Sequence, residues 1–568
     1  GQPDADSPGF KGAVARRPSR YRQLYDLIDG PNGPKQLFML TATPINNKLD
    51  DFRHMVELFT RRQDNYFAST LGVNSLRGHF VRMERELKRL TQQPQEEVAP
   101  ETNLAEAERL LTGDRLFQTL VEQRSRAYVK QSQVQQGVTL ACFPDREAPR
   151  VVNYSVKKSY GRLLAKFEKA FAKDKPLFVL GLYYPLAYDK TGAVDPVLEN
   201  RQKQVVRLIR TQFLKRFESS ARAFEQSCTF LLQKLLAWVT KHCETDHEKA
   251  QLERWKRRHG ELIGYVHHRQ HELWGDEDPE DADEDFVTDE MLEDVDQLPR
   301  DQYKVEDIIA DTFDDMDQLA EFLDDLSDFK TQHDDKLQAL IRLLKGDPVL
   351  KVHKVLIFTE FAHTARYLAK ELKAAGFEGV EQIDSGSKRD RSEVIRRFAP
   401  YYNGSSSPQL ATEAQQPIRV LISTDILSEG LNLQDATRLI NYDLHWNPVR
   451  LMQRIGRVDR RMNPDIEARI LADHPDQKDL RGKIVYWNFL PPEELEDLLR
   501  LFTRVAHKTL RISKTFGIEG KKLLRPEDDY DALRIFNQTY EGKTTPLEEM
   551  HLEFQRLLKA HPELETRL

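Results

Sequence analysis

The segment QRIGRVDRR, from Gln453 to Arg461, places four arginines around one glycine within nine residues. Arginine keeps its charge at any ordinary pH, so these cations repel one another unless an anion compensates them. One interpretation is the solvated end of a basic helix, and the other is a site for the phosphates of a nucleotide. Arg457 and Arg460 are three residues apart, so both could reach one triphosphate. A guanidinium there would stabilise the charge that develops during phosphoryl transfer.

The residues before this segment indicate what could hold the arginines in place. Asn447 can cap a helix that starts at Pro448, because proline suits the first helical position. Leu451, Ile455 and Val458 would form an apolar stripe on that helix, able to dock on a sheet. The arginines would then be held rigidly.

From residue 332 onward, apolar runs alternate with amphipathic stretches. HKVLIFTEF, IRVLIST, TRLINYD and GKIVYWNFL are expected strands, and AHTARYLAKELKAAGF is an expected helix that Gly376 ends. This alternation predicts an α/β fold with a mostly parallel sheet. Polar residues directly after the strand ends line the ligand crevice of such sheets. Here they are Thr359-Glu360, Thr424-Asp425 and Asp443.

A further strand–loop–helix unit is expected near the beginning of the chain. QLFML, residues 36–40, is an apolar run typical of a buried strand, and the polar loop TATPINN follows it. KLDDFRHMVELFT then has apolar residues at helical spacing: Phe52, Met55, Val56 and Phe59.

Between residues 60 and 275 the sequence is expected to be mainly helical, with one extended run at 150–156. Within it, LKRFESSARAF should pack one helix face and leave Lys215 and Arg216 free for a polyanion.

The net charge of −7 hides a strong asymmetry. Residues 276–328 hold 24 acidic and two basic residues, a charge of −22, so the rest of the chain carries +15. A basic body fits a polyanionic partner. The acidic stretch is expected to be a solvated insert, helical in part near MDQLAEFLDDL.

The bulk properties exclude several classes. Three scattered cysteines among 568 residues argue against a disulfide framework or a metal site, and they favour a reducing compartment. No apolar run is long enough to cross a membrane, and the amino-terminal residues do not resemble a signal peptide.

Five segments, in the right order along the chain, resemble the motifs of superfamily two helicases and translocases. LTATP resembles motif III, LIFTEF motif IV, STDILSEGLNL motif V and QRIGRVDR motif VI, while DSGSKRDRSEVIRRF resembles the segment between motifs IV and V. NYDLHWNP narrows the resemblance to the Swi/Snf-type branch. The sequence is most similar to bacterial members, including the RNA-polymerase-associated ATPase and helicase-like proteins of phage-defence loci.

This resemblance implies a motor of two RecA-like lobes that bind ATP and Mg²⁺ between them and move on double-stranded DNA in the bacterial cytoplasm. Arg457 and Arg460 would be arginine fingers, with Gln453 orienting the γ-phosphate or the attacking water. Thr41 and Thr43 would sense the γ-phosphate from the first lobe. Residues implied in coupling nucleotide to DNA are Glu429, Gly430, Asn432 and Gly456, and residues implied in backbone phosphate contacts are Thr359, Ser385, Arg389, Arg391 and Thr424.

The phosphate-binding loop and the acidic magnesium box of such motors are not found in this sequence. We expect the first lobe to be truncated or supplied by another chain, so this chain alone should not hydrolyse ATP. The expected organisation is a remnant of the first lobe at 1–60, a helical region at 61–275, the acidic insert or linker at 276–331, the second RecA-like lobe at 332–490 and a helical extension at 491–568.

Two classes of function remain at this point. The first is the carboxyl-terminal part of an ATP-dependent DNA translocase or helicase-like motor, with possible defence-system or transcription partners. The second is a non-catalytic subunit, derived from a motor half, that binds nucleic acid or a protein.

Overall fold

In a computed structural model of the chain, the structure describes these residues: 20–28, 36–40, 49–92, 114–121, 126–136, 142–147, 149–171, 179–192, 195–264, 298–384, 390–425, 431–445, 448–492, 495 and 546–561. The chain divides into two compact units. The first comprises Gly1–Gln131, His507–Lys522 and Gln538–Leu568, and the second comprises Ser132–Ala506 and Leu523–Asn537.

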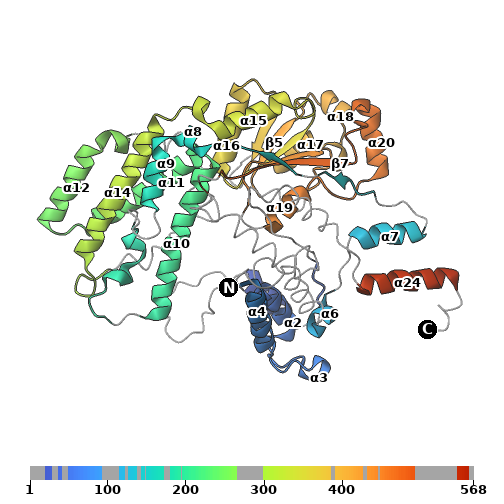
Figure 1. Ribbon diagram of the computed structural model, residues 1–568, viewed down its shortest axis with the longest axis horizontal. Coiled ribbons are helices and arrows are strands. Elements are labelled where there is room, and N and C mark those ends of the chain that lie inside the picture. The colour runs from blue at the N-terminus through green and yellow to red at the C-terminus, as the bar shows by residue number, and fades with distance from the viewer. Residues whose placement is uncertain are drawn as a thin grey trace, which may run out of the picture. The chain divides into compact units, whose positions relative to one another are not determined.

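The second unit is built around a parallel sheet (Figure 1). Its strands are β1 (Asp145–Arg146), β2 (Arg150–Val152), β3 (Val355–Phe358), β4 (Val380–Ile383), β5 (Val420–Ser423), β6 (Arg438–Asn441) and β7 (Lys483–Phe489). They follow the order β1-β7-β6-β3-β5-β4, with β2 also pairing β7, and every pairing is parallel. The predicted α/β fold with a parallel sheet is confirmed.

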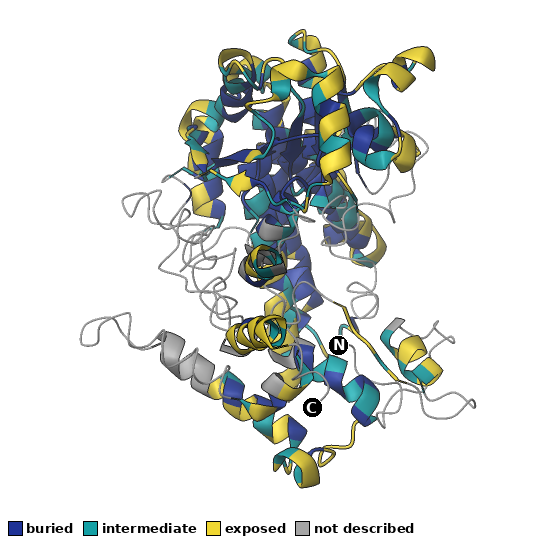
Figure 2. Ribbon diagram, turned by 90° about the vertical axis from the view of Figure 1, so that its right-hand side faces the viewer, coloured by how far each residue is buried: buried dark blue, intermediate teal, exposed yellow. Residues whose placement is uncertain are grey.

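The central strands are buried along their whole length because both faces of the sheet are covered. β3, β5 and β6 are buried at every position, as is usual for parallel sheets between helices (Figure 2). The predicted helix at 362–377 is α16 (Ala362–Ala374), and Gly376 ends it with a positive φ of 84° that glycine adopts without strain.

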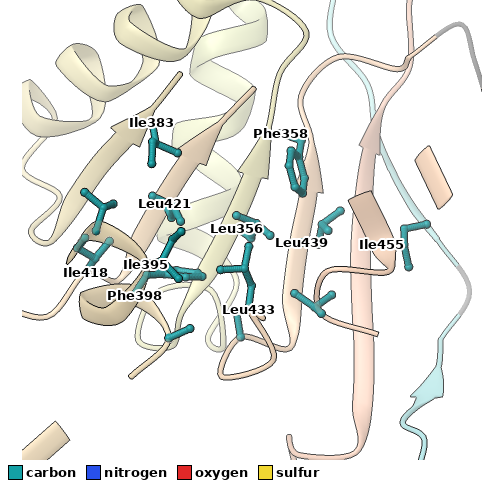
Figure 3. Packing of buried hydrophobic residues seen from close by; sticks show 14 of the residues in the cluster. Leu356, Phe358, Ile383, Ile395, Phe398, Ile418, Leu421, Leu433, Leu439 and Ile455 are labelled. Atoms are coloured by element: carbon teal, nitrogen blue, oxygen red, sulfur yellow. The ribbon is translucent and has the colours of Figure 1, made fainter. Parts of the chain in front are cut away.

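The core of this lobe joins the sheet to α17 (Arg391–Phe398) and α19 (Pro448–Ile455). Figure 3 shows Phe358 and Leu439 of the sheet in one apolar cluster with Ile455. Leu451, Ile455 and Val458 are buried, so the predicted apolar stripe docks on the sheet as expected.

The strand β4 was not predicted from the sequence. Its sequence VEQI is buried only at its two ends, with Glu381 and Gln382 partly exposed between them. An edge strand has one unpaired side, so it does not need the continuous apolar run of a central strand.

A helical body lies between β2 and β3 in the chain. It contains α8 (Val156–Tyr160), α9 (Arg162–Ala170), α10 (Pro196–Ser219), α11 (Ala221–His242), α12 (Asp246–Arg258), α14 (Val305–Ser327) and α15 (Asp335–Gly346). Aromatic rings fill its interior; the rings of Phe167 and Phe217, for example, stack with centroids 4.1 Å apart. Short 3-10 turns occupy Gly181–Tyr183 and Pro185–Tyr188.

The acidic stretch 276–328 was expected to be a solvated insert, and this is wrong for residues 305–327. Residues 305–327 form α14, and Ile308, Phe313 and Leu323 on one face are buried. The acidic residues lie mostly on the other face, and the apolar residues at spacings of three and four drive the packing. The predicted helical part near MDQLAEFLDDL lies within α14, while residues 276–297 lie outside the described part of the chain.

The first unit contains α1 (Arg20–Ile28), α2 (Leu49–Thr60), α3 (Ala68–Leu71), α4 (Leu76–Gln92), α6 (Arg115–Leu120) and α24 (Pro546–Ala560), while α7 (Arg126–Gln136) crosses the boundary between the units. Its core contains Phe52, Val56 and Phe80, and Phe59 packs against it. The predicted amphipathic helix after TATPINN is therefore confirmed.

The predicted strand at 36–40 is wrong. These residues have no regular secondary structure, and Leu40 is fully exposed. A strand satisfies its backbone groups by pairing, and no strand of the described chain pairs with this run. The domain boundaries predicted from the sequence stay predictions.

Candidate nucleotide and nucleic-acid site

The helix α19 and the turn after it carry the arginine-rich segment. α19 ends at Ile455, so Arg457 and Arg460 lie in the turns that follow rather than on the helix. Backbone bonds shape this turn, with the amides of Arg457 and Val458 donating to the carbonyls of Arg454 and Ile455 at 3.1 Å each. The turn is thus continuous with a helix that is docked on the sheet.

Arg454 fastens α19 to the carboxyl ends of two strands. Its Nε and Nη2 donate to the two carboxylate oxygens of Asp425 at 2.5 and 2.9 Å, and its Nη1 donates to the carbonyl of Asp443 at 2.8 Å. Burial alone would raise the pKa of Asp425, but the Arg454 guanidinium outweighs it, so this pKa lies below its usual value. Both partners are therefore charged.

Arg457 and Arg460 flank one short loop. Arg457 is 8% exposed, and its Nε and Nη1 donate to the carbonyls of Gln453 and Leu431 at 3.1 and 3.4 Å. Arg460 donates through Nη1 to the Oδ1 of Asn432 at 2.7 Å and through Nε to the carbonyl of Gly456 at 3.1 Å. The structure therefore brings together five of the residues singled out in the sequence: Arg457, Arg460, Gln453, Asn432 and Gly456.

The side chain of Gln453 leaves a polar atom unsatisfied. Its amide Oε1 is buried and has no hydrogen-bond partner among the described residues. A buried acceptor without a partner is unfavourable, so a water or a ligand hydroxyl is the expected donor. This atom lies one turn before Arg457.

One acidic residue of the arginine turn, Asp459, and its basic partner Arg146 were not predicted from the sequence. Asp459 is fully buried, and its Oδ2 lies 2.5 Å from the Nε of Arg146 in β1. The amide of Met462 also donates to the carbonyl of Cys142 at 2.7 Å. The segment 142–146 therefore closes one side of the turn. The signal for Asp459 was its place between two arginines, but nothing near Arg146 in the sequence points to this pairing.

The polar residues after β3 and β6 contact one another, while their predicted place in a ligand crevice stays a prediction. The carboxylate of Asp443 accepts hydrogen bonds from the Thr359 hydroxyl and, at 3.0 Å, from the amide of Glu360. Burial would raise the pKa of Asp443, but the Lys336 ammonium and the Thr359 hydroxyl hold it below its usual value. Asp443 is thus an ionised centre at the carboxyl edge of the sheet.

The candidates for DNA contacts separate into three groups. Arg391 is exposed on the first turn of α17, where its charge is accessible to a phosphate. Thr424 is 7% exposed, and Thr359 is fully buried with its hydroxyl bonded to Asp443, which leaves no exposed surface of Thr359 for a phosphate. Residues outside the described part of the chain are Thr41, Thr43, Ser385, Arg389, Glu429 and Gly430.

The expectation that Lys215 and Arg216 are free for a polyanion is wrong. Lys215 Nζ donates to Glu360 Oε1 at 2.5 Å. Arg216 is buried, and its guanidinium carbon lies 4.7 Å from the centroid of the Phe361 ring. Both cations therefore hold α10 against the lobe. The segment LKRFESSARAF is packed as predicted, with Phe217 and Phe224 buried, but it spans the end of α10 and the start of α11 and is not one helix face.

For cofactors, the described residues offer phosphate partners but no ligand set for Mg²⁺. The arginine turn has the donors that a triphosphate needs. Within the described ranges, no three His, Cys, Asp or Glu residues lie close enough together to hold a metal ion. None of the described helices has the length and apolar character of a membrane span.

Comparison with known proteins identifies the class of this lobe. Residues 335–462 match the family model of the helicase conserved C-terminal domain. The matched range contains β3 to β6, α19 and the arginine turn. The second unit therefore contains a helicase C-terminal RecA-like lobe, and the resemblance to superfamily two helicases is supported.

Individual relatives agree with that class. The chain is 35% identical over 146 residues to the protein named Uncharacterized ATP-dependent helicase YqhH of Bacillus subtilis (strain 168), which is 26% of this chain and 22% of that protein. It is 34% identical over 145 residues to the RNA polymerase-associated protein RapA of Sodalis glossinidius (strain morsitans), which is 24% of this chain and 13% of that protein. The chain thus matches less than a quarter of the length of either relative.

Among solved structures, the chain is similar to the C-terminal part of the Fun30 ATPase domain. The identity is 14% and the TM-score 0.27, with 70% of this chain and 99% of that chain covered.

Proposed function

We propose that the chain is the carboxyl-terminal part of an ATP-dependent motor of the Swi/Snf type that translocates on double-stranded DNA. The observation that carries the proposal is the arginine turn 456–460. Its helix is fastened by the buried Arg454–Asp425 pair, and Arg457 and Arg460 lie beside the loop at Leu431 and Asn432. Preorganised cations need little rearrangement when charge develops on a phosphate, which is how an enzyme lowers this type of barrier.

In this proposal Arg457 and Arg460 bind the β- and γ-phosphates of ATP held by the partner lobe. Gln453 supplies its unsatisfied amide oxygen to the attacking water. Asn432 holds Arg460 and belongs to the loop that couples the nucleotide to DNA, together with Glu429, Gly430 and Gly456. Thr41 and Thr43 sense the γ-phosphate from the other lobe, which also supplies the ligands of Mg²⁺.

DNA would be held through its backbone phosphates. The proposal keeps Arg391 and Thr424 for this role, together with Ser385 and Arg389, which precede Arg391 in the chain. Phosphate contacts of this kind do not depend on base sequence and weaken with salt. Thr359 enters the proposal as the residue that orients Asp443.

The experiment is DNA-stimulated ATP hydrolysis by the full-length protein that contains this chain. Arg457→Ala should lower turnover by about 10³-fold or more, because removing an arginine finger has an effect of this size, and should leave ATP binding nearly unchanged. Arg461→Ala is the control, since Arg461 is the one arginine of the segment outside the Gln453–Arg460 pattern and is exposed. Equal turnover in Arg457→Ala and wild type would reject the finger assignment, and a wild type without ATP hydrolysis would favour the binding subunit.

The setting follows from the resemblance to bacterial proteins. We place the protein in the bacterial cytoplasm, with a role in phage defence or beside transcription partners. Phage plating efficiency on cells with and without the gene tests this: equal plating with every phage would reject the defence role.

A further inference from the structure

Hydroxyl groups bond the corner between α10 and α11 to the RecA-like lobe. Ser219 ends α10, and Ser220 is the N-cap of α11, where its Oγ accepts from the amide of Ala223 at 3.1 Å. Both hydroxyls share hydrogen bonds with Thr364 Oγ1 of α16, at 2.7 and 2.8 Å. Ser219 Oγ also donates to Asp443 Oδ2 at 2.8 Å.

Each hydroxyl has only one proton to donate, and this decides which group donates and which accepts in each of these hydrogen bonds. Asp443 is ionised and only accepts, so the one hydroxyl proton of Ser219 is committed to it. Thr364 must then donate to Ser219, and Ser220 to Thr364. Aligned bonds of this kind strengthen one another in a low-dielectric interior, so the corner is held by one ordered row of hydroxyls that ends on Asp443.

Charged groups bond the same turn of α10 to the lobe. Lys336 Nζ of α15 donates to Glu218 Oε1 at 2.8 Å and to Asp443 Oδ1 at 2.9 Å. Lys215 pairs with Glu360 directly after β3. All of these residues but Lys215 and Glu360 are fully buried or nearly so.

The backbone of Asp443 contacts the arginine segment, while its side chain contacts the α10–α11 corner. Its carbonyl accepts from Arg454 Nη1 at 2.8 Å, and Arg454 lies three residues before Arg457. Two hydrogen bonds therefore connect the α10–α11 corner to α19, the helix directly before the proposed arginine fingers: Ser219 to Asp443, and Arg454 to Asp443.

From that corner the two helices extend far from the sheet. α10 has 24 residues and α11 has 22, so they are about 36 and 33 Å long at about 1.5 Å per residue. Figure 1 shows both running away from the strands, with α14 beside them. A rotation of about 10° at the corner would move the far ends by about 6 Å over a helix of this length.

We call the helices α10 and α11 together the arm. We propose that Ser219 and Asp443 are positioning residues that join this arm rigidly to the arginine turn, so that a change at the nucleotide site moves the arm. The movement of the arm with each ATP cycle rests on the proposed motor activity, whereas the rigid connection does not. Each ATP cycle rotates the lobe and the arm together. The far end of the arm then moves several ångströms, and this movement pushes on DNA or on a protein bound to it.

The test compares Ser219→Ala with Ser227→Ala in the full-length protein. Both substitutions remove one buried hydroxyl, but Ser227 Oγ donates to the carbonyl of Ala223 within α11. The first readout is amide hydrogen exchange of residues 448–460 without nucleotide. Ser219→Ala should speed this exchange by about tenfold, because it loosens Asp443, while Ser227→Ala should leave it unchanged.

The second readout is the distance travelled on DNA per ATP hydrolysed, measured by displacement of a triplex-forming strand together with phosphate release. Ser219→Ala should lower this ratio at least threefold and lower ATP turnover less than twofold, whereas Ser227→Ala should match wild type. Unchanged exchange in Ser219→Ala, or an unchanged ratio, overturns the inference. If wild type hydrolyses no ATP, the proposed function fails by itself, and the exchange experiment still decides whether the connection exists.

Discussion

Arg454 is fully buried and donates to both carboxylate oxygens of Asp425, 29 residues earlier in the chain. This pair explains how several arginines can crowd into one short segment. Arg454 is neutralised by a carboxylate inside the lobe, while Arg457 and Arg460 contact backbone carbonyls and the Asn432 amide. Arg454 therefore holds α19 on the sheet, while Arg457 and Arg460 are directed toward the loop at 431–432.

Arg454→Met tests the fastening. The substitution leaves the largely buried Asp425 carboxylate without its nearest cation, and breaking one side of a buried pair costs up to about 3–5 kcal/mol of unfolding free energy. Urea unfolding of the chain measures it. Arg342→Met is the control, because Arg342 is largely exposed where it lies 3.4 Å from Asp335, and exposed pairs contribute about 1 kcal/mol or less. Similar losses in both variants would contradict the assignment.

Asn432→Ala tests the position of Arg460. Without the Asn432 amide oxygen, the guanidinium loses the partner that orients it. In the full-length protein we expect kcat for ATP hydrolysis to fall about tenfold, an effect of about 1.4 kcal/mol on the barrier, with little change in KM. Asn463→Ala removes an exposed helix cap in the same lobe and should lower stability by about 1 kcal/mol without changing kcat. A change in KM alone for Asn432→Ala would argue against the role of Arg460 in turnover.

Arg391→Ala tests the proposed DNA contact at the start of α17. If Arg391 neutralises one phosphate, its removal should weaken binding equally for all duplex sequences. It should also reduce the slope of log K against log salt by about 0.9. Arg397→Ala is the matched control, because Arg397 is in the same helix and donates to the carbonyl of Gln416 at 2.8 Å. Fluorescence anisotropy across a salt series distinguishes the two, and identical slopes would remove Arg391 from the interface.

Asp315→Asn tests a pH effect in the helical body. Asp315 accepts hydrogen bonds from the amides of Val179 and Leu180 at 2.7 Å each, but burial raises its pKa to about 7, with Asp311 adding to this rise and Arg210 opposing it. The folded state therefore binds a proton that the unfolded state has lost between about pH 4 and pH 7.

Stability must then fall as the pH rises through that window, by up to about 4 kcal/mol for a shift of this size. Asp315→Asn has no such proton to lose, so its unfolding free energy should fall less over the window than that of wild type. Asp324→Asn, at an exposed position of the same helix, should follow the wild-type profile. Parallel curves for wild type and Asp315→Asn, measured by urea unfolding at several pH values, would show that the carboxyl stays ionised.

Local patterns in the sequence were sufficient for much of the RecA-like lobe. Short runs rich in apolar residues predicted β3, β5 and β6, because strands of a covered parallel sheet are buried on both faces. The stripe of Leu451, Ile455 and Val458 predicted the docking of α19. The same patterns failed for residues 36–40, because no strand of the described chain pairs with this apolar run. They also missed β4, whose two middle positions are polar.

By itself, the sequence determined which charged residues lie near the arginine turn, because their spacing along the chain is a local property. Only the tertiary structure decided which partner each of them has. Arg454 meets Asp425, Arg146 meets Asp459, and Lys215 meets Glu360, across separations of 29, 313 and 145 residues. The physical reason is that a buried charge is stable only beside an opposite charge, and the folding of the sheet, not the order of the chain, places that charge.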